Sequence, residues 1–127
     1  MGYRVLVVDD SPVLRIMLQE MLVSLGHQVV GEASSGAEAL KAYRELKPDL
    51  VTLDISLPDM DGFAVLQNIR RADPGAKVMF VTGNDQKAIE QKASSFKALG
   101  VLHKPFDSTE LSIIIEKCRP HMQRPGA

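Results

Sequence analysis

The segment VTLDISLPDMDG at residues 51–62 decides the fold. Residues 50–53 form a short, apolar and partly β-branched run, which is typical of a buried strand. The run ends at the carboxylate of Asp54, and a loop rich in proline, aspartate and glycine follows. Ligands of open parallel α/β sheets bind beyond the carboxyl ends of the strands, so Asp54 is a candidate site residue if other strands also end in reactive side chains.

Further apolar runs predict strands over residues 3–8, 27–32, 77–81 and 101–102, in addition to residues 50–53. Apolar side chains at helical spacing predict helices between and after them, over residues 12–25, 36–46, 62–72, 86–99 and 108–118. Ser35 and Glu38 have the spacing of a capping box, and Asp107 or Ser108 is expected to cap the last helix.

Strands and helices alternate five times along the chain. This pattern predicts an α/β fold with a parallel sheet, right-handed crossovers and helices on both faces. We expect one domain over residues 1–118 and a C-terminal tail over residues 119–127, where prolines recur and apolar residues are few. The tail could equally be the start of a linker.

The composition is that of an ordinary globular domain, with 127 residues, 45% apolar residues, 24% charged residues and a net charge of -1. This composition and net charge do not indicate binding to nucleic acid or to a membrane surface. The apolar run at residues 5–8 is too short for a signal peptide or a membrane span. The single Cys118 cannot form an internal disulfide, which suits a cytoplasmic protein.

The expected strand ends carry five polar side chains, namely Asp9, Asp10, Asp54, Thr82 and Lys104. Because the strands are parallel, these side chains should meet at one edge of the sheet. Two carboxylates at about 4 Å repel each other by roughly 4 kcal/mol at an effective dielectric near 20, so the cluster must take up protons or bind a cation. Mg²⁺ is the favoured cation because it prefers oxygen ligands and phosphate. The group therefore predicts phosphoryl chemistry.

In this order and spacing the motifs VVDDS at 7–11, LD at 53–54, LPDMDG at 57–62, VTG at 81–83 and KPF at 104–106 are highly specific. The chain resembles the CheY-like receiver domains of response regulators over about residues 3–118. The resemblance implies a flavodoxin-like, doubly wound (βα)5 fold whose five-stranded sheet has the order 2-1-3-4-5.

The resemblance also implies roles for single residues. Asp54 matches the phosphoacceptor, which takes a phosphoryl group from a phosphohistidine of a sensor histidine kinase or phosphotransfer protein. Thr82 and Lys104 match the hydroxyl and the cation that contact the phosphoryl group. The bond between Lys104 and Pro105 resembles one that is cis in the family.

A Mg²⁺ site follows from the same resemblance. Asp10, Asp54 and the backbone carbonyl of Ser56 match the metal ligands, while Asp9 helps through water and by holding Lys104. A further feature of the family is that the positions two residues after the phosphoacceptor and after Thr82 tune dephosphorylation. Ser56 and Asn84 occupy them.

One position departs from the family pattern. Relatives commonly have a tyrosine or phenylalanine three residues before the lysine, and its ring changes rotamer on activation, whereas this chain has Val101. A β-branched side chain cannot swing in this way. His103 or Phe106 could substitute for the ring.

The expected output is a change of the surface around the fourth helix, fifth strand and fifth helix, which a downstream effector protein recognises. We expect a monomer or weak dimer.

Two other functions are alternatives. A haloacid-dehalogenase-type phosphohydrolase also uses an aspartate nucleophile with Mg²⁺, but it needs a second aspartate where this chain has Ser56. A phosphorylation-independent docking module is favoured only by Val101.

Asp59 and Asp61 are expected to serve loop and cap geometry rather than metal binding. His103 is expected to be a sheet residue without ligand or acid-base function, and His27 a turn residue.

Overall fold

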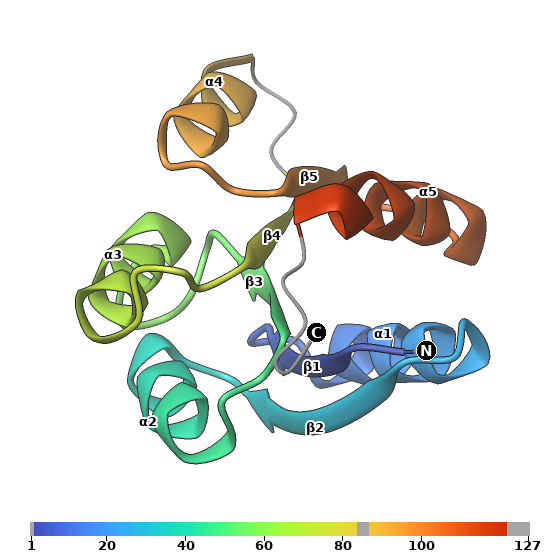
Figure 1. Ribbon diagram of the computed structural model, residues 1–127, viewed down its shortest axis with the longest axis horizontal. Coiled ribbons are helices and arrows are strands. Elements are labelled where there is room, and N and C mark those ends of the chain that lie inside the picture. Colours follow the sequence, from blue (N-terminus) through green and yellow to red (C-terminus); the bar gives the residue numbers. More distant parts are fainter. Residues whose placement is uncertain (1, 84–86, 122–127) are drawn as a thin grey trace.

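The computed structural model describes residues 2–83 and 87–121 and shows the expected doubly wound α/β fold (Figure 1). Its five strands form one parallel sheet of order β2-β1-β3-β4-β5, which confirms the order that the resemblance implies. The strands are β1 (Arg4–Val8), β2 (Gln28–Ala33), β3 (Leu50–Asp54), β4 (Val78–Thr82) and β5 (Gly100–His103). The helices are α1 (Pro12–Ser24), α2 (Gly36–Leu46), α3 (Gly62–Ala72), α4 (Lys87–Ser95) and α5 (Ser108–Cys118).

Helices cover both faces of the sheet, with α1 and α5 on one face and α2, α3 and α4 on the other (Figure 1). Each face has its own apolar core because successive side chains of a strand point to opposite sides. In β1, Leu6 and Val8 belong to the core beneath α2 and α3, and Val5 and Val7 belong to the core beneath α1 and α5. Burial on both faces explains why β3 and β4 have no exposed side chain.

Helix α4 is shorter than the periodicity predicts. It ends at Ser95, whereas the expected helix continued to residue 99. The reason is local: Lys97 adopts a left-handed backbone with φ of 58°, and the N–H of Leu99 donates to the carbonyl of Val78 at 2.9 Å, next to the sheet. The expected first residue of this helix, Gln86, lies outside the described residues.

The predicted capping box of α2 is half wrong. Ser35 Oγ accepts a hydrogen bond from the N–H of Glu38, as expected. The carboxylate of Glu38, however, accepts from the N–H and the hydroxyl of Ser34 at 2.8 and 2.9 Å, and not from the N–H of Ser35. A complete capping box occurs at α5, where Asp107 and Glu110 each accept from the backbone of the other.

Beyond α5, residues 119–121 form a 3₁₀ helix, and residues 122–127 lie outside the described part of the chain. The domain boundary at residue 118 therefore remains a prediction. None of the helices within the described ranges has both the length and the apolar character needed to cross a membrane.

His27 lies in the connection between α1 and β2, as predicted, but it is buried there. Its ring is 9% exposed and stacks on Tyr3 with 5.3 Å between the ring centroids. Nδ1 accepts a hydrogen bond from the N–H of Tyr3 at 3.0 Å, so this nitrogen must be unprotonated. Burial lowers the pKa of His27 below 6.5, and the positive charge of Arg119 lowers it further.

This lowered pKa predicts a pH dependence of stability. Because the folded-state pKa of His27 lies below the unfolded value, its contribution is complete above about pH 6.5 and is lost as the pH falls through the folded-state pKa. We expect the free energy of unfolding, measured in urea, to fall between pH 7.5 and pH 5 by more in the wild type than in His27→Gln. Equal losses in both proteins would contradict this assignment.

Candidate functional site

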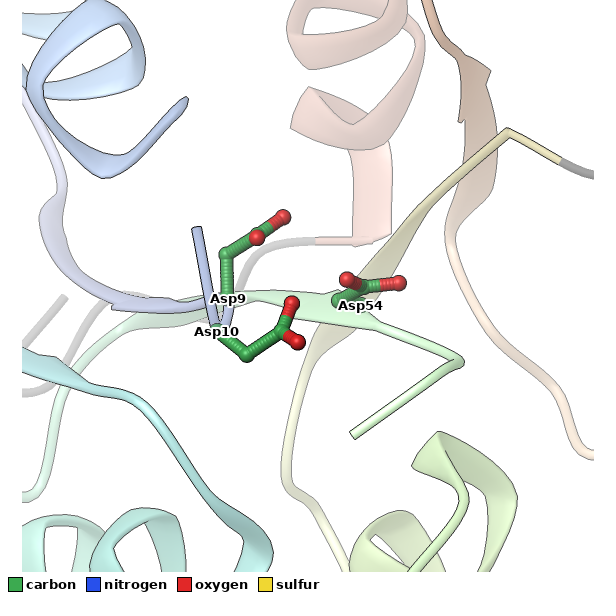
Figure 2. A group of neighbouring side chains, drawn as sticks. All are labelled: Asp9, Asp10 and Asp54. Carbon is green, nitrogen blue, oxygen red and sulfur yellow. The ribbon is translucent and has the colours of Figure 1, made fainter. Parts of the chain in front are cut away.

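Three carboxylates meet at the carboxyl edge of the sheet (Figure 2). Asp9 and Asp10 directly follow β1, and Asp54 is the last residue of the neighbouring strand β3. Each offers an oxygen within 4.8 Å of the others. Asp9 is fully buried and Asp54 is 4% exposed, whereas Asp10 faces solvent. The structure thus brings together the three aspartates that were predicted to form a metal site.

Lys104 places one positive charge between two of these carboxylates. Its Nζ lies 3.0 Å from Asp9 Oδ2 and 3.3 Å from Asp54 Oδ2. The lysine follows β5 and precedes a cis bond to Pro105, as the resemblance implied. Burial alone would lower the pKa of Lys104, but the neighbouring carboxylates of Asp9 and Asp54 outweigh burial and raise it. The side chain is therefore a fixed cation.

The Asp54 carboxylate is held by two donors and is strongly desolvated. Its Oδ1 accepts from the N–H of Ser56 at 3.0 Å, and its Oδ2 faces Lys104. Burial raises the pKa of Asp54 above its ordinary value, and the negative charge of Asp9 adds to this rise, while Ser56 and Lys104 oppose it. A desolvated carboxylate of this kind retains more nucleophilic character than a hydrated one.

Thr82 is buried at the end of β4, the strand next to β3. Its carbonyl accepts a hydrogen bond from the N–H of Lys104 at 2.8 Å. Thr82 also stands opposite His103 in the pairing of β4 with β5. Thr82 is therefore joined through the backbone to both His103 and Lys104.

The side chains at this edge fit a hard divalent cation. Oδ2 of Asp9 is buried and lacks a hydrogen bond of good geometry within residues 2–83 and 87–121, although the Lys104 ammonium lies nearby. One lysine does not neutralise three carboxylates, and carboxylate oxygen is the ligand that Mg²⁺ prefers. Ser56 donates its N–H to Asp54 and forms a β-bridge with Asp61. Metal binding by the Ser56 carbonyl stays a prediction.

Asp59 and Asp61 serve helix caps, as predicted. Asp59 accepts hydrogen bonds from the N–H groups of Gly36 and Ala37 at 2.7 and 2.9 Å, so it ties the loop after β3 to the start of α2. These bonds lower the pKa of Asp59. Asp61 is the N-cap of α3 and accepts from the N–H of Ala64 at 2.8 Å.

Sequence reasoning missed two contacts around the site. Arg15 of α1 donates to the carbonyl of Asp9 at 2.5 Å and pairs with Glu32 at 3.1 Å. His103 of β5 contacts Glu90 of α4 at 3.0 Å. Neither contact could be predicted from residue spacing, because each joins two elements that are distant in the sequence and close only in the folded protein. Asn84, predicted to tune dephosphorylation, lies outside the described residues.

A doubly wound sheet with an acidic cluster and a lysine at its carboxyl edge is the architecture of the receiver domains of two-component signalling. The family model of the response regulator receiver domain matches residues 5–116, and the chain belongs to that family.

Several relatives of the chain are chemotaxis proteins named CheY. The chain is 38% identical over 117 residues to chemotaxis protein CheY of Thermotoga maritima, which covers 92% of this chain and 98% of that protein. It is 37% identical over 117 residues to CheY of Bacillus subtilis, with the same coverage of 92% and 98%. A chain of the CheX-CheY-BeF3-Mg²⁺ complex from Borrelia burgdorferi matches with a TM-score of 0.87 and 28% identity, over 95% of this chain and 90% of that one.

Gly62 lets the loop after Asp54 fold back on the strand. A Cβ atom there would lie 2.6 Å from the carbonyl oxygen of Asp54 and 2.9 Å from Cα of Ile55, whereas a Cβ at Gly83 would meet nothing within 4 Å. We expect Gly62→Ala to lower the free energy of unfolding in urea by about 1–3 kcal/mol, the usual cost of overpacking. Gly83→Ala is the matched control and should cause no loss; equal losses would contradict the steric argument.

Proposed function

We propose that the protein is a response regulator that accepts a phosphoryl group on Asp54 in a Mg²⁺-dependent reaction and thereby switches its protein contacts. The observation that carries this proposal is the environment of Asp54: a desolvated carboxylate, 4% exposed, 3.3 Å from a fixed ammonium and beside two further carboxylates. Membership of the receiver family supports the same conclusion.

In the proposed reaction an Asp54 oxygen attacks the phosphorus of a phosphohistidine on a partner protein. The new O–P bond gives an acyl phosphate while the P–N bond breaks, and the imidazole leaves with the electron pair and takes up a proton. Lys104 lies where it can contact an oxygen of the transferred group, and the hydroxyl of Thr82 supplies a neutral donor. A Mg²⁺ ion held by Asp10, Asp54 and the Ser56 carbonyl would offset negative charge on the phosphoryl oxygens.

The partners that fit this function are a sensor histidine kinase or a phosphotransfer protein as donor and an effector protein as target. Phosphorylation changes the local charge by roughly -1.5 to -2, which is enough to bias an existing conformational equilibrium. We place the protein in the cytoplasm, acting as a monomer or weak dimer without direct contact with nucleic acid.

A phosphorylation-independent docking module is the second candidate, and Val101 favours it. This residue lacks the ring that relatives use, and its side chain is partly buried against the core beneath α2 and α3. The phosphohydrolase alternative has no such support, because Ser56 offers no carboxylic acid for protonating a leaving group.

Acetyl phosphate provides a direct test of the phosphoacceptor. After incubation with acetyl phosphate and Mg²⁺, we expect the intact mass of the wild type to increase by one phosphoryl group, because a desolvated Asp54 is the nucleophile. Asp54→Asn should stay unmodified, while Asp107→Asn, which keeps a good helix cap, should behave as wild type. An unmodified wild type would overturn the proposal and favour the docking module.

Metal binding is tested separately from phosphorylation. A ligand that binds only the folded state raises the free energy of unfolding, by about 2.7 kcal/mol at 100 times its Kd. We therefore expect Mg²⁺ to raise the unfolding temperature of the wild type in calorimetry, and Asp10→Asn to lose more than half of that rise. The same rise in Asp10→Asn and in the control Asp107→Asn would exclude Asp10 as a ligand.

A further inference from the structure

Helix α4 packs on the core beneath α2 and α3 through few apolar side chains, among them Ile89 and Ala93. Only Ala93 is fully buried among the described side chains of the helix. Its C-terminal end is held by Arg70 of α3, whose guanidinium donates to the carbonyls of Phe96 and Lys97. Lys92 adds a contact with the ring of Phe63 at 4.5 Å from its centroid. These contacts fix the C-terminal half of α4 to α3.

The N-terminal half of α4 is joined to β5 by Glu90 and His103. Nε2 of His103 lies 3.0 Å from Oε1 of Glu90. Because a carboxylate only accepts hydrogen bonds, Nε2 carries the proton and donates. The other ring nitrogen, Nδ1, is buried and has no hydrogen-bond partner among residues 2–83 and 87–121. The contact with Glu90 is therefore the hydrogen bond that orients the ring. The unpaired Nδ1 makes this ring position less favourable, since a buried polar atom without a partner costs free energy.

His103 is also directly connected to the candidate phosphorylation site. It stands opposite Thr82 in the pairing of β4 with β5, and it immediately precedes Lys104. The N–H of Lys104 donates to the Thr82 carbonyl at 2.8 Å. A movement of the Thr82 or Lys104 backbone is therefore transmitted to the backbone of His103 and so to its imidazole ring.

Of the two residues that could substitute for the missing ring, the structure favours His103. Phe106 is 9% exposed and packs in the core beneath α1 and α5, on the opposite face of the sheet from α4. His103 is partly exposed and already contacts α4.

We propose that the Glu90–His103 hydrogen bond holds the N-terminal half of α4 on β5 before phosphorylation, and that it opens when Thr82 and Lys104 engage the phosphoryl group. His103 thereby acts as a positioning residue that links the site to α4. The helix then moves about its C-terminal half, which Arg70 retains. This inference rests on the proposed function of Asp54.

The test uses beryllofluoride with Mg²⁺ as a mimic of the phosphoryl group on the full chain. If opening of the hydrogen bond accompanies binding, its removal favours the bound state by linkage. Glu90→Ala should then bind beryllofluoride about twofold to fivefold more tightly, which is the range expected for the loss of one partly exposed hydrogen bond. Glu45→Ala is the matched control, because Glu45 and Glu90 are both helical glutamates with 60% side-chain exposure. It should bind as the wild type does.

Two further readouts separate this role from simple packing. In hydrogen exchange, beryllofluoride should accelerate the amides of residues 91 and 92 in the wild type, because these amides follow the unbonded first turn of α4. In Glu90→Ala the same amides should exchange rapidly without beryllofluoride. In a double-mutant cycle, His103→Ala and Glu90→Ala should each tighten binding, and the double variant should gain no more than either one.

The outcomes are distinguishable. Unchanged affinity and exchange in Glu90→Ala, or additive effects in the cycle, would overturn the role of this hydrogen bond while leaving Asp54 as phosphoacceptor. Failure of the wild type both to bind beryllofluoride and to be phosphorylated by acetyl phosphate would overturn the proposed function and this inference together.

Discussion

The electrostatic balance at the carboxyl edge of the sheet is the constraint on which the site depends. Folding removes Asp9 and Asp54 from water and places them beside Asp10, and the Lys104 ammonium lies within 3.3 Å of both buried carboxylates. Charges in such surroundings are costly unless they are paired. The raised pKa values of Asp54 and Lys104 both follow from this balance, because burial makes the charged form of Asp54 less favourable and the neighbouring carboxylates make the charged form of Lys104 more favourable.

The loop after β3 keeps Asp54 in place through contacts that involve no metal ligand. Asp59 binds the first N–H groups of α2, Asp61 caps α3, and the N–H of Gly62 donates to the carbonyl of Ile55 at 2.7 Å. The loop is thus fastened to two helices and to the strand itself. Because helix N-termini attract carboxylates, these acidic residues stabilise the loop and are not free to join the cluster of Asp9, Asp10 and Asp54.

The sequence predicts the strand ends well and the contacts between distant elements poorly. Asp9, Asp54, Thr82 and Lys104 could be placed at one edge because parallel strands align their carboxyl ends, whatever their exact bounds. The buried role of His27 depends on Tyr3, which is 24 residues away, and the partner of Glu38 was shifted by one residue to Ser34. Such pairings follow from the packing of whole elements, for which a periodic pattern carries no information.

Because Val101 replaces the usual ring, the free energy of the proposed switch must come from other contacts. Moving a two-state equilibrium from mostly off to mostly on needs about 5.5 kcal/mol of differential interaction, whereas a partly exposed pair such as Glu90–His103 contributes about 0.2–1 kcal/mol. In the mechanism that we propose, most of the switching energy must therefore arise at the phosphoryl group on Asp54, from contacts with Lys104 and Thr82. In the same proposal the Glu90–His103 pair only adjusts how readily α4 moves, and a helix with a single fully buried side chain can respond to so small a change in free energy.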